Sequence, residues 1–221
     1  MEDTATAKCV LCAVQTAGLD PDLPGVRNYL SPLRQEKLLR LKRREDRARS
    51  VCAGLALRAA FALWGMAPLD EMAGENGRPM LPAPWDLSLS HAGELGAAVL
   101  AQTAVGVDTE TADRDIARLR RKLCSGEERD VPDTDLPVLW TAKEAYLKLT
   151  GEGISVPMEW LTVRENRLFR EGREAALLSR IPAPDGYLIT LATRERVEPE
   201  VKIFTPEEVL RLLEEERKIH G

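Results

Sequence analysis

Two acidic residues lie two positions apart in the segment VGVDTE, residues 105–110. The segment reads as a strand, and alternate side chains of a strand share a face, so Asp108 and Glu110 are expected side by side. Neighbouring carboxylates repel each other unless a proton or a cation lies between them. Mg²⁺ takes oxygen ligands, typically one or two carboxylates together with substrate phosphates. The pair therefore suits Mg²⁺ held against a diphosphate, and the alternative is a polar strand end in solvent.

A third carboxylate, Glu144, is followed four positions later by Lys148 in the segment VLWTAKEAYLKLTGEGIS, residues 138–155. Helical spacing places Trp140, Glu144 and Lys148 in one stripe beside an apolar stripe. Gly151 ends the helix, as glycine does just past a helical C-terminus. The alternative to a functional pair is an exposed ion pair, worth about 0.3–0.5 kcal/mol.

Cations gather in residues 34–49, RQEKLLRLKRREDRAR, although the whole chain has a net charge of −5. A local basic patch on an acidic chain favours a small anionic ligand over nucleic acid. The alternative is a solvated helix face, which is what most charge runs form. His91 follows the alternating residues LSLS and is expected at a strand end, where sites are often built. A structural histidine is the alternative there.

A mixture of helices and strands must position these residues. Helices are expected from the Ser31-Pro32 cap, over 45–64, within 113–123, over the 138–150 region, and from a capping box at Thr205. Strands are expected at 7–14, 87–90, 160–164, 167–169 and 187–193, and in GAAVLA and AVGVDTE, which a turn near Gln102-Thr103 joins. Loops are expected at 74–84 and, exposed, at 125–137. Interspersed helices and hairpin-like strand pairs predict the α+β class rather than a parallel doubly wound sheet.

Composition indicates a cytoplasmic globular protein. Of 221 residues, 44% are hydrophobic and 30% charged, an ordinary balance for that class. No apolar run approaches the ~20 residues of a membrane span, and MEDTATAK lacks the features of a signal peptide. Cys9 and Cys12 form a C-x-x-C, but no second pair completes a zinc site. They read as reduced thiols on a buried strand, and Cys52 as a thiol on an apolar helical stripe.

The ordered set of motifs resembles the Sfp-type 4′-phosphopantetheinyl transferases. After the basic segment come Gly77-Arg78-Pro79, Ser90-His91 at a strand end, the V-G-V-D-x-E strand, and W-x-x-K-E-x-x-x-K at residues 140–148. Residues 151–155 fit the G-x-G-h-S segment, h being apolar, that often follows. The resemblance spans residues 31–157 or so. Each motif is weak alone, and their ordered combination is specific.

The resemblance implies a reaction and a fold. Phosphopantetheine moves from coenzyme A to a serine hydroxyl of an apo acyl or peptidyl carrier protein, with Mg²⁺ or Mn²⁺, and 3′,5′-ADP is released. Two similar α+β subdomains related by a pseudo-twofold, residues 1–103 and 104–204, would enclose the active site in a cleft, followed by a C-terminal helix at 205–221. A monomer would suffice, because the two halves complete the cleft.

The resemblance also assigns roles by position. Asp108, Glu110 and Glu144 would bind the metal, and Glu144 is also the candidate general base. Lys148 would contact the coenzyme A phosphates and steady the leaving group, and His91, with Ser90 beside it, would contact the same phosphates. Glu144, Lys148 and His91 would thus be the catalytic residues. The remaining coenzyme A residues would be Arg34, Lys37, Arg49, Ser50 and Arg78, of which Arg78 replaces the lysine frequent in the family.

The carrier protein would be the macromolecular partner. Carriers are generally acidic around their serine, and Ile116, Leu119 and Leu123 with Arg120 and Arg121 form a candidate docking helix. The alternative is a helix packed into the core with solvated arginines. Rival functions are a non-catalytic relative that binds coenzyme A or a carrier, another Mg²⁺-dependent enzyme acting on a diphosphate, and a nucleic-acid binder using residues 34–49. No nucleic-acid or membrane partner is expected.

Overall fold

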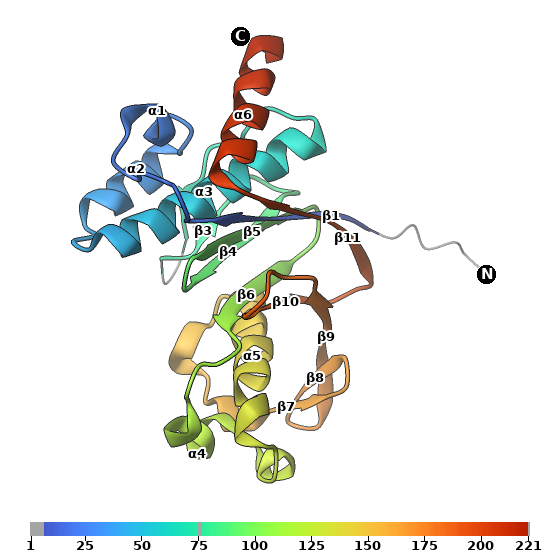
Figure 1. Ribbon diagram of the computed structural model, residues 1–221. Coiled ribbons are helices and arrows are strands. Elements are labelled where there is room, and N and C mark those ends of the chain that lie inside the picture. The colour runs from blue at the N-terminus through green and yellow to red at the C-terminus, as the bar shows by residue number, and fades with distance from the viewer. Residues whose placement is uncertain (1–6, 75–76, 221) are drawn as a thin grey trace.

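The computed structural model describes residues 7–74 and 77–220 and contains two main β-sheets with helices packed on them (Figure 1). This arrangement confirms the α+β class. Residues 75 and 76 of the predicted 74–84 loop lie outside the described residues. The pseudo-twofold relation between the halves and the subdomain boundaries stay predictions.

The first sheet has the strand order β11-β1-β5-β4. β1 (Ala7–Gln15) pairs in parallel with β11 (Val197–Phe204) and antiparallel with β5 (Leu95–Ala101), which pairs antiparallel with β4 (Asp86–Ala92). The helix α3 (Arg44–Trp64) packs against β5 and β1, and α6 (Pro206–His220) packs on α3. Both predicted helix starts are confirmed. Ser31 caps α2 (Pro32–Leu39), and Thr205 and Glu208 cap each other's backbone N–H at the start of α6.

The second sheet has the strand order β6-β10-β9-β8-β7. Its strands are β6 (Val105–Thr111), β7 (Leu161–Arg164), β8 (Arg167–Arg170), β9 (Arg173–Ile181) and β10 (Tyr187–Thr193). The helix α5 (Leu136–Thr150) lies against β6 and β10. Smaller elements are α1 (Pro24–Arg27), α4 (Arg120–Leu123), the hairpin of β2 (Met72–Ala73) and β3 (Pro79–Met80), and short 3₁₀ turns.

The two sheets pack face to face through one of three apolar cores, and the other cores lie under α3 and α5. Cys9 faces the core between the sheets and Cys12 faces the core under α3, as the alternation of β1 predicts. Both thiols are free and fully buried, and burial raises the pKa of Cys9 to about 12. Cys52 is also buried and free.

Three expectations about local structure are wrong. β5 and β6 are joined by the predicted turn but enter different sheets, so they do not form a hairpin. The predicted helix within 113–123 is reduced to a 3₁₀ turn, Ala117–Leu119, and one α-helical turn, α4. The 125–137 loop is not wholly exposed, because Ser125 and Glu128 are buried. β9 and β11 were not predicted.

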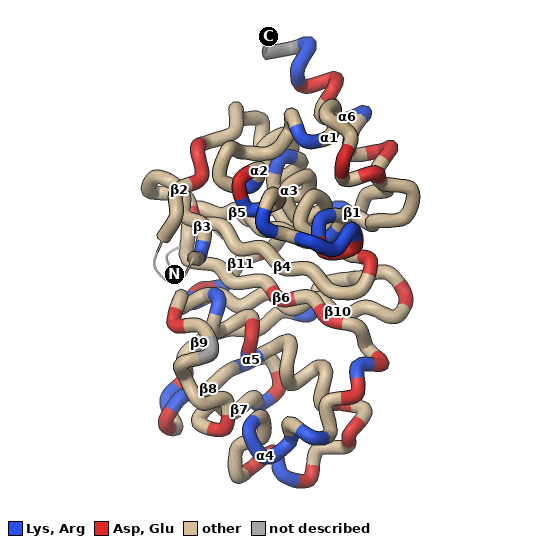
Figure 2. Tube along the Cα trace, turned by 90° about the vertical axis from the view of Figure 1, so that its left-hand side faces the viewer, with Lys and Arg blue, Asp and Glu red and all other residues tan. Residues whose placement is uncertain are grey.

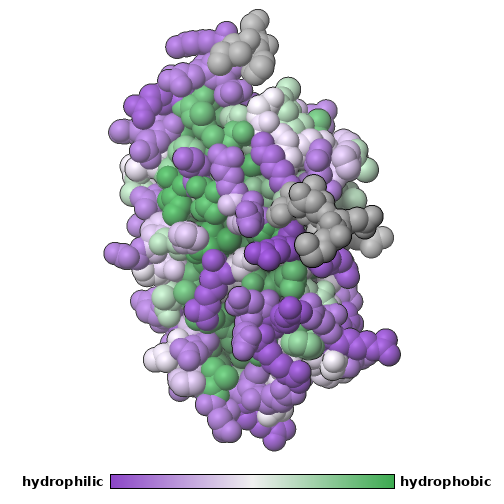
Figure 3. Space-filling view, turned by 90° about the vertical axis from the view of Figure 1, so that its right-hand side faces the viewer, coloured by the Kyte–Doolittle hydropathy of each residue, from purple (hydrophilic) through white to green (hydrophobic). Residues whose placement is uncertain are grey.

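Hydrophilic side chains cover much of the side on which β9 and β11 lie, with apolar patches between them (Figure 3). No helix within residues 7–74 and 77–220 combines the length and the apolar character needed to cross a membrane.

Candidate functional site

The site lies along a seam between the edge strands of the two sheets, β4 and β6. Their backbones do not pair with each other. Instead, Asp86, Ser88 and Ser90 on β4 accept hydrogen bonds from the backbone N–H groups of Val105, Val107 and Thr109 on β6, each at 3.0 Å. The three acceptors are two residues apart and so share a face of β4. The alternation seen in LSLS is therefore used to join the two halves of the molecule in register.

Gly106 brings α5 close to β6 at this seam. A Cβ atom at position 106 would lie 2.1 Å from the carbonyl oxygen of Ala145 and 2.4 Å from the backbone nitrogen of Leu149. Only glycine permits that approach without a shift of backbone atoms. The glycine of the V-G-V-D motif therefore positions the helix that carries Glu144 and Lys148 beside the strand that carries Asp108 and Glu110.

Asp108 and Glu110 are both buried, and each faces a cation. The Lys148 Nζ lies 2.7 Å from Asp108 Oδ1 and also donates to Ser90 Oγ at 2.8 Å. The Ser90 hydroxyl in turn donates to Asp108 at 2.8 Å. Glu110 pairs with the Arg114 guanidinium and accepts the Thr111 N–H at 2.9 Å. Hence two of the three predicted metal ligands carry a side-chain counter-charge in this structure.

Glu144 differs from the other two carboxylates. It is half-buried, and no hydrogen bond or ion pair joins its carboxylate to another residue within the described ranges. Burial raises the pKa of Glu144 above its ordinary value of 4.5, and Asp108 raises it further, while Lys148 and Arg114 oppose the shift. An unpaired carboxylate with a raised pKa beside two other acids suits a proton acceptor.

Cations from three elements, α2, α3 and α5, lie near His91 at the open end of the seam. Burial lowers the pKa of His91, and the positive charges of Lys148, Arg49 and Lys37 lower it further. Lys37 keeps an exposed surface, yet burial and the neighbouring Arg34 lower its pKa as well. In Figure 2 the basic segment at the start of α3 lies beside β4, with the acidic positions of β6 just below it. The structure thus brings together predicted phosphate ligands from α2, α3, β4 and α5.

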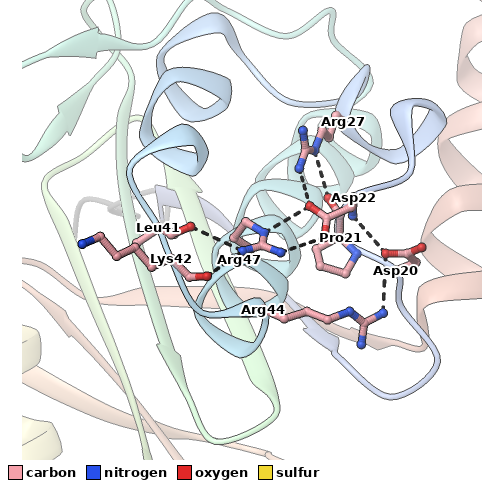
Figure 4. Close-up of polar contacts among 8 residues, drawn as sticks. All are labelled: Asp20, Pro21, Asp22, Arg27, Leu41, Lys42, Arg44 and Arg47. Atoms are coloured by element: carbon pink, nitrogen blue, oxygen red, sulfur yellow. Dashed lines mark hydrogen bonds and ion pairs between the residues drawn. The ribbon is translucent and has the colours of Figure 1, made fainter.

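Not every cation of the 34–49 segment is available for a ligand. Arg47 pairs with Asp22 at 2.8 Å and donates to the carbonyl of Lys42 at 3.0 Å, and Arg44 contacts Asp20 (Figure 4). Arg27 also binds Asp22. Arg27 and Arg47 thus tie the turn before α1 to α3, and Arg47 has a structural role. Arg44 is mostly exposed, so the solvated-face alternative holds for it.

Three of the predicted coenzyme A residues are engaged within the protein. Arg34 is 6% exposed and pairs with Glu71 at 3.0 Å, and Arg49 pairs with Asp46. Arg78 donates to both oxygens of Asp86 at 2.8 Å and to the carbonyl of Val105 at 3.3 Å. Arg78 therefore fastens the beginning of the seam. Ser50 is buried on α3.

The predicted docking helix is largely packed into the core under α5. Ile116 is 3% exposed and Leu123 is 1% exposed, so neither can meet a partner in this conformation. Leu119 is only partly buried. The core-packing alternative thus holds for Ile116 and Leu123.

Arg114 is a site residue that sequence reasoning missed. Besides pairing with Glu110, its guanidinium carbon lies 4.9 Å from the centre of the Trp140 ring. The only signal in the sequence was that an arginine lies four positions after Glu110. Because β6 ends at Thr111, strand alternation does not place the Arg114 side chain, and no helical periodicity relates Arg114 to α5.

The donor set fits a hard divalent cation, although its present geometry is not a ready ligand cage. Among the described residues, His, Cys, Asp and Glu side chains form no group of three arranged around a common point. Asp108 and Glu110 are turned toward Lys148 and Arg114 instead. The three carboxylates nevertheless offer the oxygen atoms that Mg²⁺ takes as ligands.

Known proteins are similar to this chain. A family model described as the 4′-phosphopantetheinyl transferase superfamily matches residues 104–192, which include Asp108, Glu110, Glu144 and Lys148. A 4′-phosphopantetheinyl transferase of Bacillus subtilis is 28% identical over 148 residues, 61% of this chain and 66% of that protein. The 4′-phosphopantetheinyl transferase Sfp of Bacillus subtilis (strain 168) is 22% identical over 189 residues, 80% of this chain and 81% of its own length. The 4′-phosphopantetheinyl transferase ffp of Bacillus subtilis is 25% identical over 162 residues, 66% of this chain and 70% of its own length.

Proposed function

We propose that this chain, which is similar to the 4′-phosphopantetheinyl transferase superfamily over residues 104–192, transfers 4′-phosphopantetheine from coenzyme A to a serine hydroxyl of an apo acyl or peptidyl carrier protein. The observation that carries the proposal is the position of Lys148. The Lys148 ammonium group contacts Asp108 and Ser90. It also lies close enough to His91 to lower the pKa of the imidazole. It therefore joins the acidic end of the seam to the basic end.

The basic end suits the phosphates of coenzyme A. Lys37, Arg49, His91 and Lys148 converge there without a full set of acidic partners, so an anion would relieve their mutual repulsion. Lys148 can turn from Asp108 to the leaving phosphate, where developing negative charge needs compensation. Arg34 is expected to support this end from its pair with Glu71 rather than by direct contact in the present conformation.

Glu144 is assigned the role of general base. The serine oxygen attacks the phosphorus next to the pantetheine arm, and the serine proton passes to Glu144 directly or through one water. The phosphoanhydride bond breaks, and its electron pair leaves with 3′,5′-ADP. Asp108, Glu110 and Glu144 would hold Mg²⁺, which supplies charge neutralisation at the diphosphate when bound.

We propose the acidic carrier surface as the partner of the exposed arginines around α4. A pocket of about 630 Å³ is lined by Arg118, Arg120, Arg121 and Arg129, with Cys124 at its wall. Leu119 keeps part of its surface at this end of the molecule. Leu119→Glu should raise the carrier KM and leave the coenzyme A Kd unchanged. Leu23→Glu is the matched control, because Leu23 is 51% exposed in the other half. Equal loss of carrier and coenzyme A binding would refute the docking role.

The reaction is tested by the intact mass of an apo carrier incubated with this protein, coenzyme A and Mg²⁺. A gain of one phosphopantetheine, abolished by EDTA and by Glu144→Gln but not by Glu165→Gln, is the expected result. Glu165 is an exposed glutamate in the turn between β7 and β8, so it controls for the change of charge. Coenzyme A binding without transfer to any of several carriers would favour a non-catalytic relative. Cleavage of coenzyme A without carrier labelling would favour a diphosphate hydrolase.

A further inference from the structure

Arg114 is placed at the metal end of the seam by two contacts from different elements. Its guanidinium pairs with Glu110, the last acidic residue of β6, and lies over the Trp140 ring of α5 at 4.9 Å. Its backbone N–H closes a turn onto the carbonyl of Thr111 at 3.3 Å. A guanidinium over an aromatic face is attracted by the ring within about 6 Å. The turn and the ring together hold the positive charge beside Glu110.

The charges at this end of the seam are arranged unequally. Lys148 compensates Asp108, Arg114 compensates Glu110, and Glu144 has no cation of its own. A divalent cation bound by these carboxylates would occupy the region in which Arg114 now supplies positive charge. Like charges in a half-buried site disfavour each other, so both cannot contact Glu110 at full strength.

We propose that Arg114 is a displaceable counter-ion of the metal site, which competes with the divalent cation for Glu110 and so sets metal affinity. This inference rests on the proposed metal site of the transferase. In the absence of metal, Arg114 keeps Glu110 compensated and turned toward the 111–114 turn. When the metal binds, Glu110 exchanges the guanidinium for the metal. Arg114 is a positioning residue in this scheme, because it acts through Glu110 and contacts no substrate.

The test is a titration of the full chain with Mn²⁺ alone as the metal probe, at saturating coenzyme A and without carrier, so that no turnover occurs. Free Mn²⁺ is counted from its electron paramagnetic resonance signal. Arg114→Gln should bind Mn²⁺ about twofold to fivefold more tightly than the wild type, the range expected when a partly exposed ion pair no longer competes. Arg173→Gln removes the same charge from an exposed position on β9, outside the proposed sites, and should leave the Kd unchanged.

A second pair of variants separates competition from a general effect of charge. In a Glu110→Gln background, Arg114→Gln should no longer tighten Mn²⁺ binding, because the contested ligand is absent. Unchanged or weaker binding by Arg114→Gln in the wild-type background would overturn the inference while leaving the metal site intact. Absence of stoichiometric Mn²⁺ binding by the wild type would overturn the metal site itself and the inference with it.

Discussion

Lys143 and Lys148 lie five positions apart on α5, and the protein uses them in opposite ways. Lys143 is fully buried below the helix, where its Nζ contacts Glu128 at 2.5 Å and the carbonyls of Leu123 and Met158 at 2.6 and 3.1 Å. Lys148 lies at the seam with 29% of its side chain exposed. Lys143 is thus enclosed in the core on one face of the helix, whereas Lys148 makes a partly exposed contact on another face.

The difference lies in how completely each partner is satisfied. Glu128 also accepts the backbone N–H groups of Ser125 and Val163, both at 2.7 Å, so its carboxylate is compensated entirely within the protein. Burial lowers the pKa of Lys143 and Glu128 opposes that shift. Asp108, in contrast, shares Lys148 with Ser90 at a surface that a ligand can reach. The buried Lys143–Glu128 pair therefore stabilises the fold, whereas the partly exposed Lys148–Asp108 pair can be reached by a ligand.

The largest expected effect belongs to Glu144, which follows Lys143 in sequence but lies on the side of Lys148. Glu144→Gln should lower the transfer rate by about 10²–10⁴, the usual contribution of a general base. Stability should rise slightly at neutral pH, because the ionised carboxylate is disfavoured in the folded state. Single-turnover labelling of a carrier and urea unfolding measure the two quantities. A loss of stability in proportion to activity would place Glu144 with the structural residues instead.

Lys143→Met should destabilise the fold by about 3–5 kcal/mol, since it leaves the buried Glu128 carboxylate without its counter-charge. Urea unfolding at pH 7 gives the free energy difference. The double variant Lys143→Met/Glu128→Gln should recover much of the loss, because no unpaired charge remains buried. Equal destabilisation of the single and double variants would show that packing, not charge, dominates at this position.

Lys148→Met should change stability by no more than about 1 kcal/mol, as expected for a partly exposed ion pair. Its affinity for coenzyme A should fall about tenfold or more, the cost of losing a charge-assisted phosphate contact. Calorimetric titration with coenzyme A measures this loss, and Lys143→Met, at a temperature where it is folded, is the matched control. Equal coenzyme A affinities for the two variants would remove the distinction between the lysines.

The pH dependence of Glu144 sharpens the same contrast. Its folded-state pKa is raised, so the stability it contributes is present below its ordinary value of 4.5 and is lost as pH rises through the raised value. Relative to Glu144→Gln, the wild type should therefore lose stability as pH rises above 4.5. The transfer rate should rise over the same window, because the base must be ionised. Urea midpoints and rates across that window test both signs, and a flat stability difference would contradict the burial of Glu144.

The smallest expected effect is at His91. Burial, and then the positive charges of Lys148, Arg49 and Lys37, lower the pKa of His91, so coenzyme A phosphates should move that pKa upward. Nuclear magnetic resonance titration of the imidazole with and without coenzyme A would show the shift, and His91→Asn assigns the signal. A pKa unaffected by coenzyme A would place the phosphates away from His91.

Local pattern predicted most of the helices and strands because periodicity and capping act over a few residues. The caps at Ser31 and Thr205 and the strand at 105–110 needed nothing distant. β11 could not be placed in the same way, since its pairing with β1 joins residues near opposite ends of the chain. The hairpin expected of β5 and β6 failed for the same reason: a turn specifies that two strands are close, not that they pair.

The convergence of the site followed from the family resemblance, but its internal contacts did not. Nothing local indicates that Arg34 would face Glu71, that Arg78 would face Asp86, or that Arg114 would face Glu110. Each pair is made by segments that meet only in the folded chain or across a turn of irregular geometry. Ile116 and Leu123 show the converse error, because an apolar stripe among arginines looks the same whether it meets a partner or the protein's own core.

The serine and aspartate acceptors of β4 have a consequence for how the molecule avoids self-association. An edge strand normally offers a row of unpaired backbone N–H and carbonyl groups to any passing strand. Here Asp86, Ser88 and Ser90 engage the N–H groups of Val105, Val107 and Thr109, so one exposed sheet margin shields the other. The three side-chain oxygen atoms that align the halves thus protect the N–H groups of β6 from intermolecular β-pairing. Replacing Ser88 and Ser90 with alanine would leave the N–H groups of Val107 and Thr109 without these acceptors and open this border to intermolecular pairing.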